Sequence, residues 1–154
     1  MRDPDVSQAK QRLDVVFGLA RQLPDDPEVL SHWARYLCVL VSGFLEISVR
    51  AIYGRYSRGK AAPIVANYVE AQLNGFQNPN MGKILDLAGS FNADWRVELD
   101  AASAGAPKEA VDSIVANRHS IAHGQNVGIS LVRIKEYYED AFEILELIDE
   151  QCHR

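Results

Sequence analysis

Apolar residues recur at steps of three and four along most of the chain, and signals for strands are nearly absent. This pattern predicts an all-α fold, a bundle of two long antiparallel helices, a long C-terminal helix and several short helices. The expected helices cover residues 6–23, a long segment that begins near Pro27, and residues 63–76, 82–88, 93–104, 107–122 and 130–150. Asp5 or Ser7 is the expected cap of the first helix.

The second helix is expected to be the centre of the bundle. Between Leu37 and Leu45 it is apolar on nearly every side, which is typical of a helix that several others surround. Its apolar stripe is predicted to consist of Trp33, Leu37, Leu40, Phe44, Ile47 and Ala51. Trp33, and Trp95 outside this helix, are interpreted as core residues and not as platforms for base stacking.

Length and composition favour one domain over residues 1–154, because 47% hydrophobic residues suffice for a sizeable core. The longest apolar run is far shorter than the roughly 20 residues of a membrane span, so no membrane association is expected. The N-terminus lacks the apolar centre of a signal peptide, and two cysteines are too few for a disulfide framework. We therefore expect a cytoplasmic protein, with Cys38 buried and Cys152 exposed.

One stretch of the chain combines cations with aromatic rings and contains no acid. It consists of Arg50, Tyr53, Arg55, Tyr56, Arg58 and Lys60. Single-stranded RNA binding uses this mixture for phosphate contacts and base stacking. Basic residues at an ordinary helix end also complement the helix dipole, so a purely structural role is the alternative. The formal net charge of -5 argues against binding nucleic acid through the overall field but leaves a local site open.

Arg118 interrupts an apolar helical face. On an ideal helix it lies in the middle of the stripe made by Ala110, Val111, Ile114, Val115, Ile121 and Ala122. A guanidinium cannot lose its proton to escape burial, so it needs a partner. A buried ion pair with Glu46 is the structural interpretation, although Glu46 is also four residues from Arg50.

His123 gives Arg118 a second interpretation. The two residues are about 140° apart on a regular helix, so they converge only if the helix frays at its end or a second subunit supplies one of them. An imidazole beside a fixed cation suits phosphoryl-transfer chemistry on RNA. His119 and His123 also have the spacing of a metal-binding pair, but no third ligand is evident, and we expect neither a metal nor another cofactor.

Residues 118–124 read Arg-His-Ser-Ile-Ala-His-Gly, which resembles the Arg-x(4–6)-His motif of HEPN domains. The resemblance covers about residues 30–148 and includes the long second helix, where residues 44–50 read Phe-Leu-Glu-Ile-Ser-Val-Arg, and the long closing helix. The layout is most similar to the RiboL-PSP-HEPN branch.

The resemblance implies a homodimer whose motifs meet at the subunit interface, with metal-independent endoribonuclease activity on an RNA substrate. Arg118 and His123 are then the catalytic residues, and Asn117, His119, Ser120 and Glu46 have supporting roles. A toxin or antiviral defence component, with an antitoxin or another defence protein as partner, is the expected context. The alternatives are a non-catalytic RNA- or protein-binding module of the same fold and an unrelated helical interaction protein.

Overall fold

The computed structural model describes residues 1–154 and contains seven α-helices and no strand, which confirms the all-α prediction. The helices are α1 (Pro4–Ala20), α2 (Pro27–Lys60), α3 (Pro63–Asn74), α4 (Met81–Phe91), α5 (Ala93–Ala102), α6 (Ala106–Ala122) and α7 (Leu131–Cys152). Prolines in the first turn suit four of these helices, α1, α2, α3 and α6, because that turn has no internal acceptor for the missing N–H.

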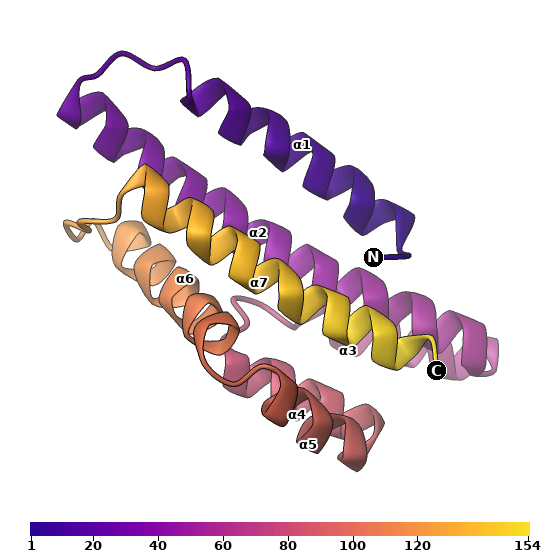
Figure 1. Cartoon of the computed structure of the whole chain (residues 1–154). Coiled ribbons are helices and arrows are strands. Elements are labelled where there is room, and N and C mark those ends of the chain that lie inside the picture. Colours follow the sequence, from indigo (N-terminus) through magenta and orange to yellow (C-terminus); the bar gives the residue numbers. More distant parts are fainter.

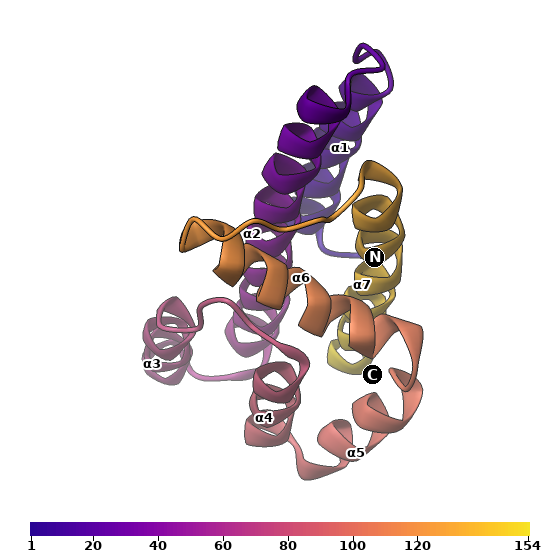
Figure 2. The ribbon, with the colours of Figure 1, turned by 90° about the vertical axis from the view of Figure 1, so that its left-hand side faces the viewer.

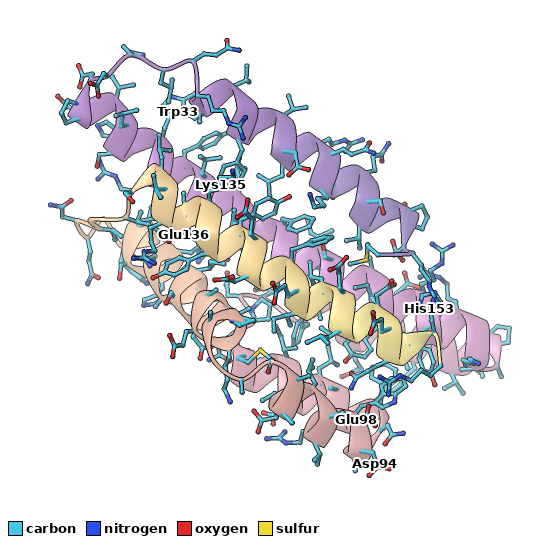
Figure 3. All side chains as sticks on the ribbon, viewed as in Figure 1. Trp33, Asp94, Glu98, Lys135, Glu136 and His153 are labelled. Atoms are coloured by element: carbon cyan, nitrogen blue, oxygen red, sulfur yellow. The ribbon has the colours of Figure 1, made fainter.

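The 34-residue helix α2 is the centre of the bundle, as expected, and packs against α1, α3, α6 and α7. Helices α1 and α2 run antiparallel, and α7 lies alongside α2 in the same direction (Figure 1). Helix α6 crosses α2 and α7, and the short helices α3, α4 and α5 gather around the C-terminal half of α2 (Figure 2). Charged side chains such as Lys135 and Glu136 cover the solvent side of α7 (Figure 3).

Helix α2 is also the one helix long and apolar enough to cross a membrane by length and composition. Its most apolar window is 61% buried inside the bundle, which is the behaviour of a core helix. Leu37, Leu45 and Val49 are fully or almost fully buried there. The apolar stripe predicted for α2 is wrong at Ile47, whose side chain is 60% exposed, because the core lies on the opposite side of the helix.

Two further expectations are corrected at the chain ends. Helix α1 begins two residues earlier than predicted, and its cap is Asp3 in place of Asp5 or Ser7: the Asp3 carboxylate accepts hydrogen bonds from the N–H groups of Asp5 and Val6. Cys152 is buried, because α7 continues past residue 150 and keeps it against the core, and burial raises its pKa to about 12. Cys38 is buried as expected.

The connection between α3 and α4 positions the start of α4 against α6. Asn80 caps α4 through the N–H of Lys83, and the N–H of Met81 donates to Asp112 of α6 at 2.8 Å. Asn78, just before this cap, has a φ of 45°, in the left-handed region. Its N–H donates to Glu46 of α2 at 2.7 Å, so α2 and α6 each hold one end of the turn.

Candidate active site

Helix α6 remains regular to its end. Beyond the cap residue His123, Gly124 has a φ of 69° and donates its N–H to the carbonyl of Ile121. The N–H of Gln125 donates to the carbonyl of Ser120 at 2.9 Å, which completes a Schellman motif. The end of α6 is therefore not frayed. Fraying was one of the two ways in which Arg118 and His123 were expected to converge.

Arg118 has no partner within the chain. Its side chain is half-buried and makes neither a hydrogen bond nor an ion pair. The predicted buried pair with Glu46 is wrong, because the Glu46 carboxylate lies 3.7 Å from Arg50 and accepts the N–H of Asn78. The alternative pairing of Glu46 with Arg50 is confirmed. The guanidinium of Arg118 thus keeps all its donors available.

Arg118 lines a polar cavity of about 690 Å³ between the C-terminal half of α6 and the start of α4, which we call the motif cavity. Its lining residues are Asn78, Asn80, Gly82, Lys83, Asp112, Val115, Ala116, Arg118, His119 and Ser120. Two cations, Lys83 and Arg118, face this space, and neither is paired with an acid. The one acid, Asp112, already accepts the N–H of Met81, so the cavity favours an anion.

The two histidines of the motif lie one above the other on α6. Their ring centroids are 4.3 Å apart with an interplanar angle of 60°, and both side chains are exposed. His119 lines the motif cavity, whereas His123 lies one turn beyond it. The structure therefore brings Arg118, His119 and Ser120 to one cavity and leaves His123 at its edge, available to another molecule.

Asn117, predicted to support the site, is partly committed elsewhere. Its amide nitrogen donates to the carbonyl of Ser113 at 2.8 Å, a bond within α6. Asn117 does not line the motif cavity. Glu46 lies outside the cavity as well, but it holds the backbone of Asn78, which does line it.

In the predicted RNA-binding stretch of α2, one of the two aromatic side chains is buried in the core. Tyr53 is 0% exposed, and its ring stacks on Phe91 at 4.8 Å, so it cannot stack on a base; burial also raises its pKa. Tyr56 packs edge-on against Phe91 and Trp95.

The cations of that stretch are mostly paired. Arg50, Arg55 and Arg58 lie within 4 Å of Glu46, Asp3 and Glu70 respectively, which leaves Lys60 without an ion pair. The arrangement corresponds to the structural alternative, a helix end held by ion pairs.

Sequence reasoning missed the contribution of the α3–α4 turn to the site. The sequence pattern places residues 78–80 between two expected helices, and Lys83 in the second of them, residues 82–88. The available signal was Asn80, which is a strong helix cap and fixes where α4 begins. Nothing in the sequence shows that this helix start meets α6 beside Arg118.

Comparison with known proteins gives one match. The family model RiboL-PSP-HEPN matches residues 7–154, which include every residue of the motif cavity and both motif residues. No curated protein and no solved structure matches the chain significantly. The match confirms the HEPN resemblance over almost the whole chain.

Proposed function

Because this chain belongs to the RiboL-PSP-HEPN family, we propose that it is a metal-independent endoribonuclease that acts at the interface between two copies of itself. The observation that supports this best is the unpaired guanidinium of Arg118. A half-buried cation without an acid partner lowers stability unless a ligand neutralises it. Guanidinium is well suited to bind phosphate oxygens through two parallel hydrogen bonds.

The proposed reaction is an internal transesterification at the phosphate. The ribose 2′-oxygen forms a bond to the adjacent phosphorus, and the bond from phosphorus to the 5′-oxygen of the next nucleotide breaks. The 2′-hydroxyl loses a proton and the leaving 5′-oxygen gains one, which yields a 2′,3′-cyclic phosphate and a 5′-hydroxyl end. The imidazole of His123 takes part in this proton transfer, and Arg118 stabilises the charge that develops on the phosphate.

Two features of the structure support a dimeric site. Arg118 and His123 are about 140° apart on a helix that is capped and regular, so the two side chains of one copy do not meet. Helix α2, against which α6 packs, exposes apolar side chains on one face: Tyr36 is 51%, Val39 40% and Ile47 60% exposed. A two-fold interface that covers this stripe removes apolar area from water.

The cellular role proposed with this activity is that of a toxin or an antiviral defence component whose cleavage is restrained or triggered by a partner protein. The RNA substrate and the second copy of the chain are the partners that the site itself requires.

The experiment is an assay of the purified protein on a mixed RNA pool in the presence of a chelator. Wild type should produce 2′,3′-cyclic phosphate ends, and Arg118→Ala and His123→Ala should each reduce cleavage at least about 100-fold. Arg133→Ala, on the exposed face of α7, is the matched control. Cleavage that persists undiminished in both motif variants contradicts the assignment, and RNA binding without any cleavage supports a binding module instead.

Mixing the two inactive variants tests the shared site. If Arg118 of one copy works with His123 of the other, each mixed dimer has one intact site and one with both changes. An equal mixture should then recover about a quarter of wild-type activity, since half of the dimers are mixed. A site within one chain predicts no recovery, because every chain then carries a defect.

A further inference from the structure

We propose that the motif cavity binds the nucleotide next to the scissile phosphate, so that Lys83, Asn78 and Ala116 determine how RNA is held and which base is accepted. This inference rests on the proposed function and adds a substrate subsite to it. None of these three residues belongs to the Arg-His motif.

The position of the cavity on α6 supports this assignment. Asp112, Ala116, His119 and His123 follow one another at steps of three and four residues and therefore share one face of the helix. The cavity extends along this face from His119 back to Asp112, about 10 Å at 1.5 Å per residue, and begins one turn before His123. Arg118 also lines the cavity, so a phosphate held by Arg118 of one copy and His123 of the other has its neighbouring nucleotide over this face.

The chemistry of the lining suits a nucleotide. The volume of about 690 Å³ lies within the range of small-ligand sites. Lys83 carries a positive charge without an acid partner; its ammonium donates only to the carbonyl of Gln77 at 3.1 Å. A backbone phosphate on the far side of the base can be neutralised there.

Asn78 is placed to contact the base. Its backbone is fixed by Glu46, whereas its side-chain amide makes no hydrogen bond within the chain and lines the cavity. The amide offers both donors and an acceptor, the groups that recognise base edges. Ala116 contributes only a methyl group, and a larger side chain at this exposed position occupies the space for the base.

The test measures RNA binding in the non-cleaving His123→Ala background, by fluorescence anisotropy over a series of salt concentrations. Adding Ala116→Phe should weaken binding about ten-fold or more, because the inserted ring fills the space for the base. Adding Lys83→Gln should weaken binding a few-fold and reduce the slope of log affinity against log salt by about one.

Asn78→Ala, in the active protein, should change the base preferred beside the cut.

Matched controls separate a local effect from general damage. Ala71→Phe places the same ring at an exposed position of α3, and Lys108→Gln removes a cation at the start of α6 that pairs with Asp100 of α5. Neither control should change affinity more than two-fold, and circular dichroism melts should show all variants folded.

The outcomes distinguish this inference from the proposed function. If wild type cleaves but the Ala116 and Lys83 variants bind and cut as the controls do, the subsite is wrong and the ribonuclease stands. If wild type does not cleave but binding depends on Ala116 and Lys83, the ribonuclease is wrong and the nucleotide site stands.

Discussion

Two cavities of nearly equal size are both lined in part by α4 and differ in almost every other respect. The motif cavity, about 690 Å³, has two unpaired cations and mostly polar walls. The second, about 660 Å³, lies between α2, α3 and α4 and is lined by apolar and aromatic side chains such as Tyr56, Leu73, Phe76 and Phe91; we call it the apolar cavity. Its one charged residue is Lys60.

The difference follows from what builds each cavity. The apolar cavity continues the core, since Leu73 on its wall is itself a core residue. The motif cavity is built from a helix start and a helix end, where capping side chains and unpaired donors are common. Stability and chemistry therefore reside in different parts of the molecule, and substitutions should separate them.

The largest effect is expected from Arg118→Leu. Replacing the unpaired cation with an apolar side chain should reduce cleavage by roughly 10² to 10³-fold, because the phosphate loses its main donor. The free energy of unfolding should be unchanged or raised by up to about 1 kcal/mol, since a half-buried charge disappears. Urea denaturation and the RNA assay measure the two quantities. A marked loss of stability would show that Arg118 is structural.

Leu73→Ala should have the opposite profile. Its side chain is 4% exposed, and truncation should lower the free energy of unfolding by about 3 kcal/mol. Cleavage by the folded fraction should remain unchanged at a temperature well below the transition. Val65→Ala, a half-exposed position of the same cavity, serves as the control and should change stability by less than about 0.5 kcal/mol.

Glu46→Ala should affect both properties, because Glu46 links the core helix to the motif cavity. Loss of a hydrogen bond from the Asn78 N–H to a carboxylate should lower the free energy of unfolding by about 2 kcal/mol. Cleavage should fall while the motif residues are intact, since Asn78 is no longer held. Glu46→Gln preserves an acceptor and should recover most of the activity. Equal activity in both variants would contradict this link.

Tyr53→Phe probes the apolar side of the comparison. The buried hydroxyl has no hydrogen-bond partner, so its removal should raise the free energy of unfolding by about 1 kcal/mol. Burial raises the pKa of Tyr53 in the folded state, so the unfolded chain ionises first as pH rises above about 10. Wild type should therefore lose stability with rising pH in that range, and Tyr53→Phe should lose less. Parallel pH profiles would contradict the assignment.

Lys60→Gln should have the smallest effect. The side chain is exposed and unpaired, so stability should change by less than about 0.5 kcal/mol. RNA affinity should change less than two-fold, in contrast to Lys83→Gln, if RNA uses only the motif cavity. A larger loss of affinity would show that the predicted RNA-binding stretch of α2 contacts RNA.

The sequence predicted the helices well because their signals are local. Proline, asparagine and aspartate mark where α2, α4 and α6 begin, and a period of 3.6 residues identifies the faces that pack. Arg118 was recognisable because it breaks such a face.

The contacts of Glu46 and Asn78 were not predictable, because they join segments that are distant in sequence. Ile47 and Tyr53 show the same limit: the pattern predicts that a helix has an apolar side, but neighbouring helices decide which apolar residues are covered. Residue type alone suggests a buried Ile47 and a more exposed Tyr53, and the structure has the reverse.

The left-handed glycine that ends α6 restricts which sequences can carry this motif. Gly124 has a φ of 69° and open space around its α-carbon, so the restriction comes from backbone conformation and not from crowding. In a library randomised at positions 122 and 124 and selected for activity, position 122 should accept many residues. Position 124 should return mainly glycine, with asparagine as the common exception. The residue after the histidine is thus part of the motif's information content, although it contributes no chemical group.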